Sequence, residues 1–230
     1  MAESGAGLVP TEPVTALAEE RGLGAWGRAT YLPKKGVFLR KWEGSRLYFF
    51  DNGLVVTGPE GYRAAYDWET ASVLQSISTI NGTAVADARY TLFDRSGAAV
   101  GIGRGLDMVL PGRREELGIT SLVKGAPFTF EGDWGPYIQE RIARAQMTRV
   151  LERFARGETV RFGAVALSGA GVSVKARSAA WTDLTRIGPS NGHITFPGAH
   201  RRGQALPSVL VPHVANLHLF CAICRRMGCT

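Results

Sequence analysis

The sequence has few of the features that mark membrane-spanning or secreted proteins. No stretch approaches the ~20 apolar residues that a transmembrane helix needs. The N-terminal residues include acidic side chains and two prolines, where a signal peptide would have a basic run followed by an apolar one. The three cysteines all lie in the last ten residues, so they are not a disulfide framework spread through a secreted fold. We therefore expect a soluble cytoplasmic protein.

Lysine is also scarce, although the formal net charge is +7. Most of the positive charge comes from arginine. A positive surface favours anionic partners such as lipid headgroups, nucleic acid or acidic proteins. An Arg-, Ala- and Gly-rich composition is equally typical of a high-GC bacterial genome, and we favour that explanation of the charge. The lysines are Lys34, Lys35, Lys41, Lys124 and Lys175.

The patterns of the common enzyme classes do not emerge. A nucleophilic triad needs a Ser or Cys with a positioned His and acid, and no such set is indicated. Residues 101–105, Gly-Ile-Gly-Arg-Gly, depart from the G-x-G-x-x-G spacing and lack the Lys-Ser/Thr of a phosphate loop, so we expect a strand end with glycine turns. Asp67 and Glu69 flank Trp68 on a predicted strand, and we expect them to be solvated acids without a catalytic role. We predict no catalytic residues, no enzymatic activity and no cofactor.

The cysteines raise the question of a metal or redox site. Cys221 and Cys224 form a Cys-x-x-Cys pair without a second pair elsewhere. In a helix, His218 and Cys224 would lie about 9 Å apart along the axis, too far to share one ion. A redox pair needs its first cysteine at a helix N-terminus, and Cys221 falls inside the predicted helix. We expect no metal; the cysteines pack as small apolar residues, with Cys229 exposed at the tail.

What the chain does contain is a pattern of strands and turns that occurs twice. Residues 46–68 indicate a strand, a tight turn, a strand, a polar loop and a strand ending in Trp68. The same order returns in residues 160–181 and ends in Trp181. Within the first copy, Asn52-Gly53 between apolar runs is a strong hairpin signal, because both central positions of such a turn favour positive φ. Trp68 and Trp181 are expected to anchor the two cores.

The remaining elements follow from periodicity and from turn residues. Thr11 and Gly22 delimit a short helix in an N-terminal leader, and short strands are predicted from residue 26 to residue 103, including residues 36–42. Pro136 opens a helix with an apolar stripe, and Pro212 opens a second, buried one. The predicted boundaries are a leader over 1–24, a first module over 25–156 with an insertion near 104–132, a second module over 157–230, and helices over 136–156 and 212–227.

These stretches resemble bacterial pleckstrin-homology-like (PH-like) domains, and more closely uncharacterised bacterial proteins with two such modules in tandem. The likeness rests on the hairpin GLVV (53–56), on its echo at 171–187 and on VPHVANLHLF at 211–220. It implies an α+β fold of two tandem antiparallel β-barrels or sandwiches, each closed by a C-terminal helix. Many of these relatives have a membrane-spanning hairpin near the N-terminus, and this chain does not.

One basic cluster is the candidate binding site: Lys34, Lys35, Arg40 and Lys41. In eukaryotic PH domains, cations around the first strand–turn–strand hold phosphoinositides. Each cation near an anionic surface contributes ~1 kcal/mol. A solvated turn with an incidental cluster of charge is the plainer interpretation, and we favour it.

The function predicted from the sequence is therefore that of a non-enzymatic scaffold. It would bind a peptide or protein partner by strand addition at a barrel edge, or in the groove beside a closing helix. Peripheral binding to anionic membrane lipid through the basic cluster is the alternative, and an unrecognised enzyme is a third possibility. Nucleic acid is not an expected partner, because the arginines are dispersed and lack an aromatic stacking platform.

Overall fold

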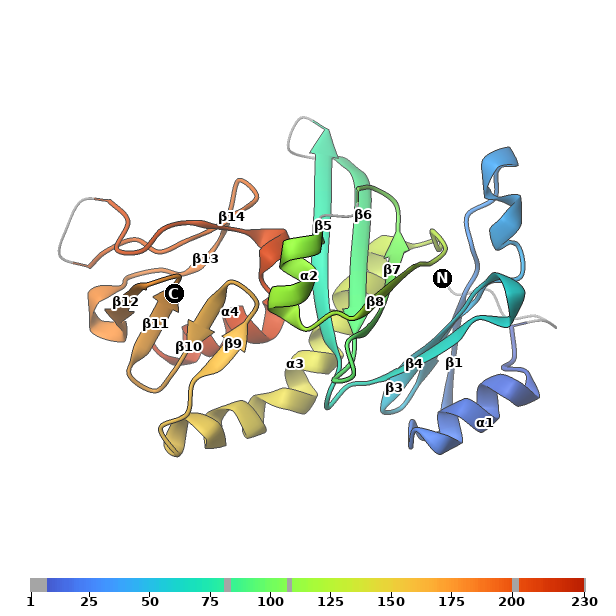
Figure 1. Cartoon of the computed structure of the whole chain (residues 1–230), viewed down its shortest axis with the longest axis horizontal. Helices are drawn as coiled ribbons and strands as arrows, with labels where there is room; N and C mark the ends of the chain where they lie inside the picture. Colours follow the sequence, from blue (N-terminus) through green and yellow to red (C-terminus); the bar gives the residue numbers. More distant parts are fainter. Residues whose placement is uncertain (1–7, 81–83, 107–108, 200–202, 230) are drawn as a thin grey trace. The chain divides into compact units, whose positions relative to one another are not determined.

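The protein is a mixed α+β molecule built from four small sheets and a few helices (Figure 1). The computed structural model describes residues 8–80, 84–106, 109–199 and 203–229. Contacts divide the chain into two compact units. Unit 1 comprises Met1–Ala71 and Ile77–Tyr137, and unit 2 comprises Ser72–Ser76 and Ile138–Thr230. The expected boundary after residue 156 would assign the whole long helix to the first module, whereas the contacts assign its residues from Ile138 onward to unit 2.

Unit 1 begins with the predicted leader helix and a four-stranded antiparallel meander. Val14 and Ala18 of the helix pack with Tyr48, Phe50 and Val55 of the sheet, which explains the apolar face of an otherwise acidic helix. Residues 1–7 of the leader lie outside the described residues. The elements are α1 (Glu12–Glu20), β1 (Trp26–Tyr31), the 3₁₀ helix η1 (Val37–Trp42), β2 (Leu47–Phe50), β3 (Gly53–Thr57), the 3₁₀ helix η2 (Pro59–Gly61) and β4 (Arg63–Asp67), with strand order β1-β2-β3-β4.

A second sheet follows, and the predicted insertion near 104–132 contributes to it. The insertion contains a short helix followed by a strand. Because the chain passes through the helix first, the strand runs in the same direction as β7 and pairs parallel with it. The long helix starts at residue 131, earlier than the predicted 136, so Pro136 lies inside it. The elements are β5 (Ser72–Ile80), β6 (Ala84–Phe93), β7 (Ala98–Gly103), α2 (Pro111–Leu117), β8 (Ser121–Lys124) and α3 (Glu131–Ala155), with strand order β5-β6-β7-β8.

Unit 2 again begins with a four-stranded meander, followed by a second sheet, here three-stranded, and a helix. Its core joins Phe154 of α3 to Phe162, Phe196, Phe220 and Ile223. The elements are β9 (Val160–Phe162), β10 (Val165–Leu167), β11 (Gly171–Val174), β12 (Arg177–Ala180), the 3₁₀ helix η3 (Trp181–Asp183), β13 (Gly188–Ser190), β14 (His193–Thr195), β15 (Val209–Leu210), the 3₁₀ helix η4 (Val211–His213) and α4 (Leu217–Arg226). The strand orders are β12-β11-β10-β9 and β13-β14-β15.

The two tryptophans of the sequence repeat occupy equivalent places in the two units. Each follows the fourth strand of its sheet and donates its indole N–H to the turn between the second and third strands. Trp68 donates to the Asp51 carbonyl at 3.2 Å, and Trp181 donates to the Ser168 carbonyl at 3.0 Å. Trp68 is buried and stacks on Phe49. Trp181 is only partly buried and packs at the margin of its core, so it anchors unit 2 less deeply than predicted.

A glycine in each of the sheets β1–β4 and β9–β12 marks a second equivalence. A Cβ on Gly53 would lie 2.4 Å from the Tyr66 carbonyl oxygen, and one on Gly171 would lie 2.1 Å from that of Ala179. Both carbonyls belong to residues two positions before the tryptophans. Close backbone approach therefore requires glycine at the start of the third strand in each unit. The predicted hairpin at Gly53 is confirmed, but its central residues are Asp51 and Asn52, and neither has positive φ.

Three further predictions about local structure are corrected. The described strands form separate open sheets rather than closed barrels. Residues 37–42, within the predicted strand 36–42, form the 3₁₀ helix η1, because no strand among the described residues pairs with them. The last helix starts at Leu217 rather than Pro212, because Asn216 adopts a left-handed conformation with φ 50°. The side-chain amide oxygen of Asn216 accepts from the Val73 N–H at 2.8 Å, and the backbone N–H of Asn216 donates to the Val73 carbonyl at 2.8 Å.

Candidate functional site

The predicted basic cluster surrounds a hollow in the surface of unit 1. The hollow encloses about 420 Å³ between the end of β1 and the start of β2, and η1 forms one of its sides. We call it the cationic hollow. Its lining combines basic side chains with apolar ones and includes a single acid, Glu43. The lining residues are Leu32, Pro33, Lys34, Lys35, Gly36, Val37, Leu39, Arg40, Glu43 and Arg46.

The four predicted cations do not play equal parts in it. Lys35 and Arg40 are exposed, line the hollow, and form no ion pair among the described residues. Lys34 also lines the hollow, but its ammonium group pairs with Glu131 at the start of α3. Lys41 is not part of the lining; its ammonium lies 5.0 Å from the centre of the Trp42 ring, a cation–π contact. The cluster therefore offers two open cations rather than four.

Arg46 adds a cation that the sequence analysis missed. It lies ten residues after the turn that ends at Gly36, directly before β2. Only the fold brings it to the hollow. Its Nη1 donates to the carbonyls of Glu43 and Ser45, each at 2.8 Å. These bonds hold the guanidinium against the loop, so Arg46 contributes a positioned charge at the wall.

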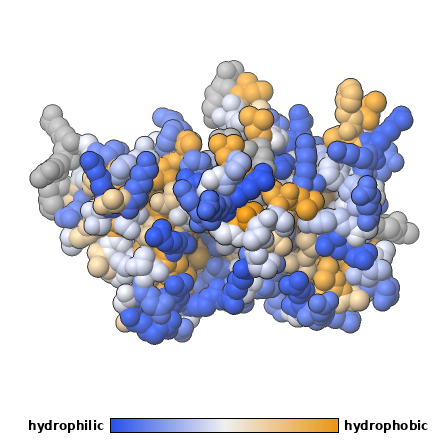
Figure 2. Space-filling model, viewed as in Figure 1, coloured by the Kyte–Doolittle hydropathy of each residue, from blue (hydrophilic) through white to orange (hydrophobic). Residues whose placement is uncertain are grey.

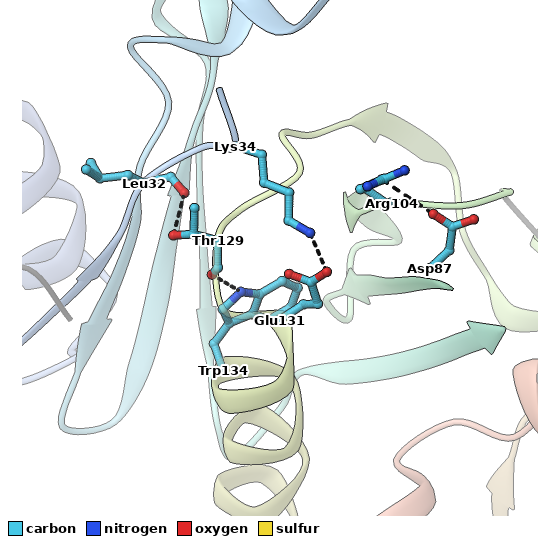
Figure 3. Close-up of polar contacts among 7 residues, drawn as sticks. All are labelled: Leu32, Lys34, Asp87, Arg104, Thr129, Glu131 and Trp134. Carbon is cyan, nitrogen blue, oxygen red and sulfur yellow. Dashed lines mark hydrogen bonds and ion pairs between the residues drawn. The ribbon is translucent and has the colours of Figure 1, made fainter. Parts of the chain in front are cut away.

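A short backbone pairing joins the base of the hollow to the segment before α3. Figure 3 shows contacts beside it, among them the Thr129 hydroxyl donating to the Leu32 carbonyl. The Lys34 N–H donates to the Pro127 carbonyl at 2.7 Å, and the Thr129 N–H donates to the Leu32 carbonyl at 2.8 Å. The Thr129 carbonyl in turn accepts from the indole N–H of the buried Trp134 at 2.9 Å. The base of the hollow is thus tied to the packed start of α3, while η1 extends away from it.

The tip of η1 exposes apolar side chains beside these cations. Phe38 is 95% exposed and Val37 is 74% exposed. Figure 2 shows hydrophobic atoms standing out, next to hydrophilic ones, over the place that η1 occupies in Figure 1. An exposed phenylalanine side chain forgoes about 1.5–3 kcal/mol of free energy that burial would contribute. A turn that only faces solvent does not explain this cost. Sequence reasoning missed Phe38 because the predicted strand would have paired and covered it.

The other sequence candidates have structural explanations. Gly103 ends β7 with φ 92°, as expected for a strand end with glycine turns, and a Cβ on Gly101 would meet the Arg89 guanidinium at 2.3 Å. Residues 188–192, Gly-Pro-Ser-Asn-Gly, have the G-x-S-x-G spacing, which the sequence analysis passed over. They form strand β13 and the turn into β14, with Asn191 and Gly192 at positive φ, and not the strand-to-helix elbow of a hydrolase.

The cysteines are free thiols, and one prediction about them is wrong. Cys229 was expected to be exposed, but it is 1% exposed, and its Sγ lies 4.0 Å from the carbonyl oxygens of Trp181 and Leu184. Cys224 is fully buried in the core of unit 2, as a small apolar residue would be. In the part of the chain that the structure describes, no group of three or more His, Cys, Asp or Glu side chains could hold a metal ion.

Comparison with known proteins adds one finding. Residues 126–228 match the model of a family of unknown function (DUF6585), and over that stretch the chain is similar to this family. The matched region starts just before α3 and ends after α4, so it takes in all of α3 together with the sheets of unit 2. Neither a curated protein nor a solved structure gives a match. Within the described residues, no helix is long and apolar enough to span a membrane.

Proposed function

We propose that this chain is a non-enzymatic binding protein that attaches peripherally to anionic membrane surfaces through the cationic hollow. The observation that carries the proposal is Phe38, 95% exposed on a loop between two cations, Lys35 and Arg40, that line the hollow. The cations would contact phosphate groups of lipid headgroups, and Phe38 with Val37 would enter the layer of acyl chains beneath them. This arrangement favours the membrane alternative of the sequence analysis over the scaffold.

The size of each contribution predicts a reversible attachment. A cation near an anionic lipid surface contributes about 1 kcal/mol, and burial of one phenylalanine contributes about 1.5–3 kcal/mol. The sum corresponds to weak, salt-sensitive binding, comparable with that of a single lipid anchor. Salt would weaken the contribution of the charges, which is screened over about 10 Å at 0.1 M, and would leave the contribution of Phe38.

We also propose that the two units are tandem PH-like modules. The order of a four-stranded meander, a second sheet and a helix occurs twice along the chain and supports this proposal. The equivalent positions of Trp68 and Trp181 and of Gly53 and Gly171 support it as well. The basic loop between β1 and β2 would then occupy the place where PH-like modules bind phosphates. Shifted pKa values give no support to catalysis: burial raises the pKa of Tyr90 to about 12 and that of Cys221 to about 11, away from neutrality.

The test is cosedimentation with vesicles of phosphatidylcholine alone or mixed with phosphatidylserine or a phosphoinositide. We expect binding to the anionic vesicles only, weakening as salt is raised. Lys35→Glu with Arg40→Glu should lower the affinity about tenfold or more, since two attractive charges become repulsive. Phe38→Ser should lower it while leaving the salt dependence unchanged. Lys34→Gln should have a smaller effect than Lys35→Gln, because Glu131 already balances Lys34.

The matched control is Lys124→Glu with Arg177→Glu, which makes the same change in net charge at exposed positions that do not line the hollow. Equal losses for this control and for the Lys35/Arg40 variant would mean that only net charge matters, and would overturn the proposed site. A stable protein partner recovered at moderate salt, together with indifference to lipid composition, would instead favour the scaffold prediction.

A further inference from the structure

The distal half of the β5–β6 hairpin is exposed and uncharged. Residues 77–80 of β5 are all exposed, and so are residues 84 and 85 of β6. A strand with one face on a core would alternate buried and exposed residues, so this part of the hairpin extends past the core (Figure 1). It nevertheless exposes branched aliphatic side chains: Ile77 is 43% exposed, Ile80 59% and Val85 57%. Between Glu69 and Asp87 the sequence has neither a charged residue nor a proline.

The open side of β5 carries peptide groups that need partners. β5 is the terminal strand of its sheet, with β6 on its inner side. At the base of β5, both the N–H and the carbonyl of Val73 bond to Asn216, so the polar groups of Val73 point to the outer side. Peptide groups alternate along a strand, and therefore those of Ile77 and Thr79 point to the same outer side. No described element bonds to them there.

This edge also lacks the protection that the other edges have. Proteins commonly blunt an edge strand with charge, proline or short length. Among the described strands, the other edges carry Arg28 on β1, Arg63 on β4, Lys124 on β8, Arg161 on β9, Arg177 on β12 and Pro189 on β13, while β15 has only two residues. Among the described edge strands, only β5 is long, uncharged and free of proline. Its composition is that of a strand that pairs with another strand.

We propose that the outer edge of β5, residues 76–80, pairs antiparallel with the same edge of a second copy of this chain. Two identical edges related by a two-fold axis cover each other completely, so the pairing closes at a dimer. Ser-Ile-Ser-Thr-Ile brings no like charges together, although the whole chain is strongly positive, and the pairing would cover part of the exposed apolar surface of Ile77 and Ile80. A bilayer suits this edge less well, because hydrocarbon would leave the peptide groups of Ile77 and Thr79 without partners.

The test is the mass of the full-length chain by light scattering and sedimentation velocity over a range of concentrations. We expect the mass to rise toward twice that of one chain. Ile77→Lys with Ile80→Lys should weaken the association about tenfold or more, since four added positive charges would lie within one short two-stranded interface. Both positions are exposed, so the fold should persist. Leu106→Lys with Leu110→Lys is the matched control, at residues 80% and 67% exposed, and should leave the dimer intact.

Cysteine substitution provides a second measurement that does not depend on affinity. Under mild oxidation, Ser78→Cys, at the centre of the paired segment, should give a cross-linked dimer on a non-reducing gel, and Ser121→Cys, on the opposite edge strand β8, should not. A chain that remains a monomer at every concentration overturns the proposal. So does a dimer that Ile77→Lys with Ile80→Lys leaves unchanged. A monomer that binds neutral vesicles and loses that binding in the double lysine variant would assign the edge to lipid instead.

Discussion

At the scale of single residues, burial governs the cysteine thiols. Burial raises the pKa of Cys221 to about 11 against a smaller opposing effect of Arg225, and burial also raises the pKa of Cys224 and Cys229. A thiol reacts as its thiolate, and at pH 8 a group with a pKa near 11 is ionised to only about one part in a thousand. The Cys-x-x-Cys pair is therefore suited to packing rather than to redox chemistry.

This predicts slow thiol chemistry in the folded chain. At pH 8 a disulfide reagent such as Ellman's should label Cys221 far more slowly than it labels free cysteine, and Cys224 and Cys229 more slowly still. Raising the pH toward 11 should speed the labelling of Cys221, because the thiolate fraction increases as the pH approaches the raised pKa. The same chain in urea, where all thiols regain ordinary pKa values, is the control. Rapid labelling of the native chain at pH 8 would contradict the burial of these groups.

At the scale of elements, the packing of α3 on β6 depends on one glycine. A Cβ on Gly135 would lie 2.3 Å from the hydroxyl oxygen of Tyr90 and 2.3 Å from the ring carbon that bears it. Tyr90 also packs edge-on against Trp134, with ring centres 5.1 Å apart, so it has little room to move aside. This contact positions the start of α3, and with it Glu131, the partner of Lys34 at the cationic hollow.

Gly135→Ala should therefore lower the free energy of unfolding by about 1–3 kcal/mol, the usual cost of overpacking a core. Gly132→Ala, one turn earlier in the same helix, is the matched control, because a Cβ there meets nothing within 4 Å. It should be neutral or stabilise by up to about 1 kcal/mol, since alanine favours a helix more than glycine does. Urea unfolding monitored by circular dichroism measures both. Equal effects at the two positions would refute the proposed close approach.

At the scale of the whole molecule, α3 contributes to two units. Val150 and Phe154, near its end, belong to the core of unit 2, and Gln139 accepts from the His218 N–H at 3.3 Å. The DUF6585 match includes the entire helix as well. A module cut at residue 157, as the sequence pattern placed it, would lack this part of its core.

We expect the fragment 126–230 to unfold cooperatively and the fragment 157–230 not to do so. The longer fragment retains Val150 and Phe154, and the shorter one exposes the apolar surface that they cover. Thermal unfolding followed by circular dichroism and dye binding would compare them. A cooperative transition in 157–230 equal to that of 126–230 would restore the boundary predicted from the sequence.

Local signals determined much of the fold from the sequence. Turn residues and alternation identified the hairpin at Gly53, the strands from β4 to β7 and the leader helix, because these depend on interactions between near neighbours. The repeat ending in Trp68 and Trp181 was also visible, and three cations of the candidate site, Lys34, Lys35 and Arg40, were found from their spacing alone.

Contacts between distant residues decided the rest. Whether residues 37–42 form a strand depends on having a partner strand, and none is in place among the described residues, so they form η1 and expose Phe38. Glu131, far along the chain, balances Lys34 and leaves Lys35 and Arg40 as the open cations. Cys229 is buried because the chain end returns to Trp181 and Leu184. Sequence thus determined the repeated elements and the basic cluster, whereas tertiary packing decided which side chains are covered and which remain available for binding.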